Sequence, residues 1–124
     1  MASLASLVTR FVDSERGAAN ILPLESVTAQ AVAAVSFYAG FAELTNLDDG
    51  GEIGEGVDIT VSEWAEIRPL FVLYVERETA LQMEATRGLG ADVFGRSSSE
   101  IGGDITQLEA DMPRRVFFHP VITV

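Results

Sequence analysis

The stretch Thr60–Gly88 constrains the fold more than any other part of the sequence. Its pattern predicts one long helix of about 40 Å at 1.5 Å per residue, and its middle, Pro69–Val75, is apolar on every face. A helix with one solvent-facing side shows an apolar stripe, whereas a helix that is apolar all round is enclosed by protein. We therefore expect the rest of the chain, or neighbouring copies of it, to cover this helix.

The ends and the middle of this helix carry recognisable signals. Thr60 and Glu63 have the spacing of a capping box, which predicts the start. Pro69 falls two turns inside, where it removes one backbone hydrogen bond and crowds the preceding turn. This predicts one kinked helix, with a pair of shorter helices as the alternative. Gly88 and Gly90 predict the end.

Two apolar segments precede the central helix. Ser3–Glu15 has apolar residues at helical spacing, with Ser3 as the predicted N-cap, although the Val, Thr and Phe residues of Leu7–Val12 also suit a strand. Leu24–Thr45 is predicted to be a helix that Pro23 introduces. The alanines at positions 29, 31, 33 and 34 keep this helix thin, so another helix could approach it closely.

A further helix is predicted over Ser98–Met112, ended by Pro113. The tail that follows, Arg114–Val124, is rich in Val, Ile and Phe and suits an extended segment, with Pro120 at an edge or a break. Such an apolar chain end either folds back on its own domain or adds to a neighbouring subunit as a strand. The sequence thus predicts a mostly α fold: a small helical bundle over residues 1–113 and an extended C-terminal arm over residues 114–124.

Composition argues against several kinds of chemistry. The chain has no cysteine and one histidine, His119, so disulfides, thiol catalysis and Cys/His metal clusters are excluded. His119 lies between Phe118 and Pro120, and we interpret it as a packed or interface side chain, because a catalytic base also needs a nucleophile and an orienting partner. We predict a protein that is not an enzyme, with no catalytic residue, no metal site and no cofactor.

The charge balance is strongly acidic. Against 19 acidic residues stand 8 arginines and no lysine, which gives a net charge of −11. Tight binding of nucleic acid needs clustered positive charge, so this chain is not expected to hold DNA. No apolar run approaches the roughly 20 residues that span a bilayer, and the first residues do not match a signal peptide. We expect synthesis inside the cell and no membrane partner.

An acidic loop is predicted over Asn46–Asp58, with four glycines and five carboxylates. Asn46, Asp48 and Glu52 have offsets that suggest a cation site. However, Val57 stands where a bidentate glutamate belongs, and the position of a third oxygen ligand is a glycine. We interpret the segment as a solvated, flexible loop.

The order of these parts, together with the motif LVTRF at Leu7–Phe11, resembles the head–tail connector (adaptor) proteins of tailed bacteriophages. The resemblance implies a subunit of a homo-oligomeric ring in a virion that is assembled in the host cytoplasm. The ring would dock on the portal protein, contact the next neck or tail protein, and let DNA pass through its lumen without specific binding. The acidic loop would project toward the lumen or the next ring. The arm would supply the partner-binding residues: Arg114, Arg115, Val116, Phe117, Phe118, His119, Val121 and Ile122.

Two other readings stay open at this point. One is another phage structural role, such as a head decoration or tail-terminator protein, which a strand-rich spectrum would favour. The other is a small cytosolic helical protein with a regulatory, binding or enzymatic role, which a folded monomer with a closed ligand pocket would favour.

Overall fold

The computed structural model describes residues 2–15, 22–47, 51–87 and 98–118. Helical residues make up 77% of that part of the chain, which confirms a mostly α fold and a small helical bundle. Among the described residues, no helix combines the length and the apolar character needed to cross a membrane. The elements in chain order are β1 Ala2–Ser3, α1 Leu4–Arg10, a π-helix Phe11–Glu15, α2 Leu24–Ala39, β2 Asp58–Ile59, α3 Val61–Arg87 and α4 Ser98–Phe118.

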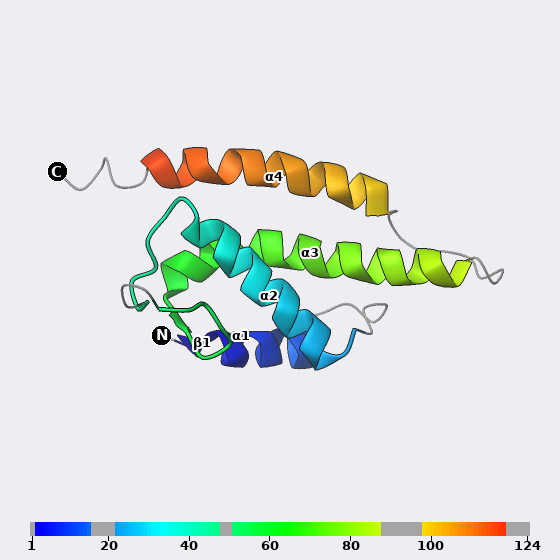
Figure 1. The fold of residues 1–124 in the computed structure, drawn as a ribbon, viewed down its shortest axis with the longest axis horizontal. Coiled ribbons are helices and arrows are strands. Elements are labelled where there is room, and N and C mark those ends of the chain that lie inside the picture. Colours follow the sequence, from blue (N-terminus) through cyan, green and yellow to red (C-terminus); the bar gives the residue numbers. More distant parts are fainter. Residues whose placement is uncertain (1, 16–21, 48–50, 88–97, 119–124) are drawn as a thin grey trace.

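The helices are arranged around α3. In Figure 1, α3 lies between α1 on one side and α4 on the other, and α2 crosses in front of both α1 and α3. The helix α4 runs antiparallel to α3 and packs chiefly against it. The two short strands pair antiparallel, with Ala2 opposite Ile59, and so join the start of the chain to the segment that enters α3.

The apolar middle of α3 is covered largely within one chain. Leu70, Phe71 and Val75 are fully buried, and the ring of Phe71 meets that of Phe11 edge to face at 4.8 Å between centroids. Pro69, however, is exposed. Within one chain α3 therefore keeps one open side, and its cover by neighbouring copies stays a prediction.

The start of α3 follows the predicted capping box. The backbone N–H of Thr60 donates to the carboxylate of Glu63 at 2.9 Å, and the N–H of Glu63 donates to Oγ1 of Thr60 at 3.2 Å. The helix then continues through Pro69 to Arg87 as one element of 27 residues. This matches the prediction of one long helix rather than two short ones.

The second helix is shorter than predicted. The prediction placed its end at Thr45, but α2 ends at Ala39. Gly40 and Phe41 donate to the carbonyls three residues back, at 3.1 and 3.2 Å, so the last turn tightens and the chain leaves the helix. A glycine at this position lowers helix stability by about 1 kcal/mol relative to alanine, which favours the early end.

The last helix is longer than predicted. It continues through Pro113 to Phe118 instead of ending at Met112. An internal proline costs a helix about 3 kcal/mol, and packing offsets this cost because Ile105 and Met112 are buried against the core on the same helix. Residues 114–118 are consequently helical, so the prediction of an extended arm from residue 114 is wrong for this part. Residues 119–124 lie outside the described residues.

Candidate partner-binding site

The predicted partner-binding residues fall in two groups. Arg114 is exposed near the end of α4, and Arg115–Phe118 continue the same helix. His119, Val121 and Ile122 lie outside the described residues. Since residues 114–118 are helical, they cannot add to a neighbouring sheet as a strand, and they advance the chain by only about 7 Å. Any strand addition is left to the residues after Phe118.

One contact that holds α4 on α3 joins Tyr74 to Glu109. The hydroxyl of Tyr74 donates to Oε2 of Glu109 at 2.6 Å, and the guanidinium of Arg77 lies 5.1 Å from the centroid of the Tyr74 ring. Burial raises the pKa of Tyr74, and the hydrogen bond to Glu109 raises it further. The phenol is therefore a neutral donor at physiological pH, and its acceptor Glu109 lies four residues before Pro113 on α4.

A second contact fixes the start of α4. The carboxylate of Glu84 accepts the backbone N–H of Ser98 at 2.8 Å and its hydroxyl at 2.6 Å. A negative charge at the first turn of a helix is favourable, because the free N–H groups and the helix dipole make that end positive. Together with the Tyr74–Glu109 contact, this bond positions α4 along α3 and so sets where residues 114–118 lie.

A buried carboxylate joins the two ends of the acidic loop. Glu63 is only 5% exposed, and besides the N–H of Thr60 it accepts the N–H of Thr45 at 2.8 Å. Burial raises the pKa of the nearby Tyr38, and the charges of Glu63 and Glu66 raise it further. The sequence predicted the contact with Thr60 through its local spacing, but it held no signal for the contact with Thr45, 18 residues away.

The described part of the acidic loop is tied to the start of α1. The carbonyls of Val57 and Glu55 accept the N–H groups of Leu4 and Ala5, each at 2.8 Å. The Oγ of Ser3 accepts the N–H of Ser6 at 3.2 Å, which confirms Ser3 as the N-cap. The loop therefore caps a helix, a structural role that its composition did not indicate.

The hypothesis of a cation site in this loop gains no support from the described residues. The described residues contain no group of three or more His, Cys, Asp or Glu side chains placed to hold a metal ion. Glu52 and Asn46 are exposed, and Asp48 lies outside the described residues.

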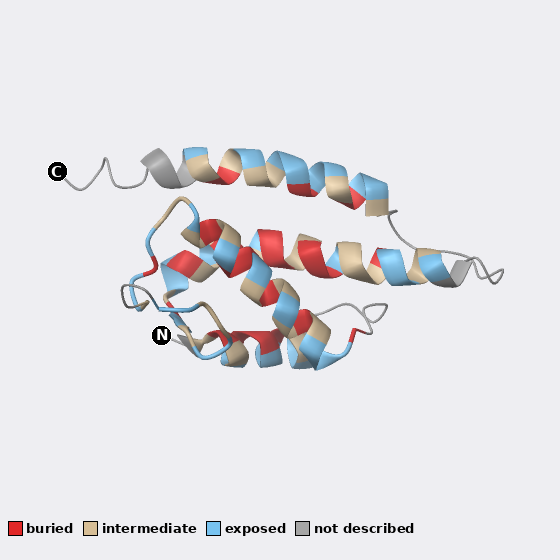
Figure 2. Ribbon diagram, in the orientation of Figure 1, coloured by how far each residue is buried: buried red, intermediate tan, exposed pale blue. Residues whose placement is uncertain are grey.

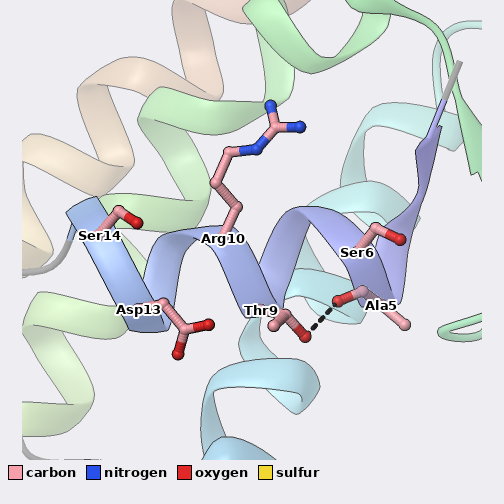
Figure 3. A pocket seen from close by; sticks show the side chains of 6 residues that line it. All are labelled: Ala5, Ser6, Thr9, Arg10, Asp13 and Ser14. Atoms are coloured by element: carbon pink, nitrogen blue, oxygen red, sulfur yellow. Dashed lines mark hydrogen bonds between the residues drawn. The ribbon is translucent and has the colours of Figure 1, made fainter.

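An open depression lies on the outer side of α1 and the π-helix (Figure 3). The hydroxyl of Thr9 donates to the carbonyl of Ala5 at 2.9 Å, and in Figure 3 the side chains of Arg10 and Asp13 point away from each other. The hydroxyl of Thr9 is therefore engaged by the backbone of α1. Its lining residues are Ala5, Ser6, Thr9, Arg10, Asp13 and Ser14.

Comparison with known proteins adds no family. A scan against protein-family models, a search of curated proteins and a search of solved structures each return no significant match.

Proposed function

We propose that this chain is a virion structural protein, a head–tail connector (adaptor) subunit whose ring docks on the portal and continues the DNA channel. The observation that carries the proposal is the placement of α4. This helix is fixed to α3 by Glu84–Ser98 and Tyr74–Glu109, and it ends at the end of the bundle where α3 begins (Figure 1). A positioned helix that leads into an apolar tail suits docking on a larger partner.

The position of the acidic loop also supports the proposed connector role. The loop that precedes α3 lies at the same end of the bundle as the end of α4 (Figure 1), and Glu52 and Glu55 are exposed there. In a ring, one end of each subunit would thus present both a docking segment and negative charge. Negative charge beside a channel keeps the DNA backbone from adhering, which agrees with the net charge of −11.

A small cytosolic helical binding protein is the second candidate, and one observation favours it. The buried cluster includes residues of all four α-helices, among them Val8, Val35, Phe71 and Ile105. A single chain therefore has a core of its own and could fold as a monomer.

The experiment compares the full chain with a chain truncated after Phe118, each alone and mixed with the portal protein encoded in the same genome. Native mass spectrometry should find a ring for both chains, and portal binding for the full chain only. Circular dichroism should show equal helix content, since the truncation leaves α4 intact. A full chain that stays monomeric and leaves the portal unbound would overturn the proposal.

A further inference from the structure

Beyond Glu25 in its first turn, the outward face of α2 carries no charge. Residues 26–42 form a run of 17 without a single Asp, Glu, Lys or Arg, in a chain of which 22% is charged. Helix α2 nevertheless has an exposed side (Figure 2), made by Ala29, Ala33, Ser36 and the adjoining Gly40. A helix at the surface of a globular protein ordinarily places charged and polar residues on that side. The outer side of α2 is therefore unlike an ordinary solvated surface.

The outer side of α4 shows what a solvated surface of this protein looks like. Its exposed residues include Glu100, Asp104 and Arg114. The lack of charge on α2 after Glu25 is thus a local property of that helix. Small side chains also let the backbone of another helix approach closely, while Val32 and Phe37, both half-buried, add apolar area on either flank.

A second surface with few charges lies on α3, bordered by Arg68 and, one turn after Val72, by the exposed Glu76. Val61 is 83% exposed, Ala65 and Pro69 are exposed, and Val72 is half-buried. These four residues, which we call the α3 stripe, follow one another at spacings of four, four and three residues and so share one side of the helix. This is the open side of α3 described above.

The α3 stripe faces away from α2. At 100° per residue, Ala65 lies about 160° from Glu63 around the helix axis. Glu63 points toward α2, because its carboxylate holds the N–H of Thr45 in the segment that follows α2. One subunit therefore presents small uncharged residues on one side and larger apolar residues on the opposite side.

We propose that the outward face of α2 packs against the α3 stripe of a second copy of this chain. The charge of the chain supports this pairing of surfaces for a second copy: two copies with −11 each repel one another, so a close contact between them needs surfaces with few charges, as these two are. A basic partner would instead be attracted to acidic surfaces such as α4. Since the two faces differ and lie on opposite sides, the contact is head to tail and can repeat from copy to copy. The inference rests on the proposed function in one respect only: it assumes that the repeated contact closes into a ring.

The test introduces a charge at the centre of each face. Ala33→Glu on α2 and Ala65→Glu on α3 place a carboxylate at exposed positions, and Ala110→Glu on the outer side of α4 is the matched control. Sedimentation velocity should find the wild type and Ala110→Glu assembled, and each of the other two variants as a 13.3 kDa monomer. Circular dichroism should give the same helix content for all four proteins, because none of the changed side chains is buried.

Mixing the two interface variants tests the head-to-tail geometry. An Ala33→Glu chain keeps its α3 stripe and an Ala65→Glu chain keeps its α2 face, so an equimolar mixture should form a dimer of one chain each and nothing larger. A monomeric wild type, an Ala33→Glu variant that stays assembled, or a mixture without dimers would overturn the inference. An Ala65→Glu variant that still dimerises alone would also overturn it, in favour of a symmetric α2–α2 contact.

These outcomes separate the inference from the proposed function. If Ala33→Glu and Ala65→Glu abolish assembly but the wild-type assembly does not bind the portal, the contact is supported and the connector role is contradicted. If both variants still form a ring that binds the portal, the connector role is supported and the proposed contact is contradicted.

Discussion

The carboxylate of Glu63 accepts the backbone N–H of Thr45 at 2.8 Å, and so joins the exit of α2 to the first turn of α3. The same carboxylate accepts the N–H of Thr60 through its other oxygen. One buried side chain thus holds both ends of the loop that also caps α1. Hydrogen bonds to a charged acceptor are among the stronger ones in proteins, so we regard Glu63 as the main fixed point of this end of the bundle.

The first prediction concerns Glu63→Gln. The amide keeps one oxygen as an acceptor but turns an N–H₂ group toward the other backbone N–H, which leaves a buried donor without a partner. We expect the free energy of unfolding to fall by about 1–3 kcal/mol, measured by urea denaturation. Glu43→Gln, an exposed change just after α2, is the control and should stay within about 0.5 kcal/mol. Equal effects of the two variants would contradict the role of Glu63.

The second prediction concerns Tyr74→Phe. Loss of the hydroxyl leaves the half-buried Glu109 without the 2.6 Å bond that ties α4 to α3. We expect a loss of about 1–3 kcal/mol in the free energy of unfolding, since the acceptor is charged. A double-mutant cycle with Glu109→Gln should give a coupling energy of about 1 kcal/mol. Strictly additive effects of the two substitutions would show that the pair does not stabilise the α3–α4 contact.

The third prediction concerns alkaline pH. The pKa values of Tyr38 and Tyr74 are raised in the folded state above the ordinary value of 10.0. Because the unfolded chain loses these protons at a lower pH than the folded chain does, folding is favoured by the two protonated tyrosines. This contribution to stability is fully present below about pH 10 and is lost as the pH rises above it. The slope should reach at most about 1.4 kcal/mol per pH unit for each tyrosine. Urea midpoints along an alkaline pH series measure this, and Tyr74→Phe should flatten the fall. The ionisation of tyrosine in the unfolded chain can be followed by its absorbance. Urea midpoints that stay constant until that ionisation is complete would refute the predicted loss of stability.

The fourth prediction concerns Pro113→Ala. Because α4 passes through Pro113, alanine supplies the missing N–H within the helix and removes the crowding of the preceding turn. We expect the free energy of unfolding to rise by about 1 kcal/mol, because the full cost of an internal proline is partly relieved by local adjustment. Pro23→Ala, at the extended N-cap of α2, gains no such bond and should not stabilise. A destabilised Pro113→Ala variant would indicate that the chain needs the proline at this point.

Local signals were predictable from the sequence, and long-range contacts were not. Ser3 and the Thr60–Glu63 pair cap their helices as their spacing indicates, because capping depends on neighbours within a few residues. The Glu63–Thr45 bond depends on how the chain returns after the acidic loop, which no local pattern encodes. Pro113 failed as a helix stop for a related reason: the burial of Met112, a tertiary effect, outweighed the local preference.

The candidate site was predictable only in part. The apolar residues of 114–118 were recognised as a segment that needs a partner, yet their helical form was missed because Val and Phe suit strands as well. The uncharged run of α2 was visible in the sequence, but its meaning depends on knowing which side is exposed. Only the packing of α2 on α1 and α3 shows that Ala33 faces outward.

The proposed function requires that this chain form a ring and that the ring dock on a portal. The most direct test is the mass of the species that forms when the purified chain is mixed with the assembled portal protein from the same genome. Native mass spectrometry should find the portal enlarged by a whole number of 13.3 kDa subunits that together form a ring. A portal of unchanged mass beside a free 13.3 kDa monomer would rule out the connector role.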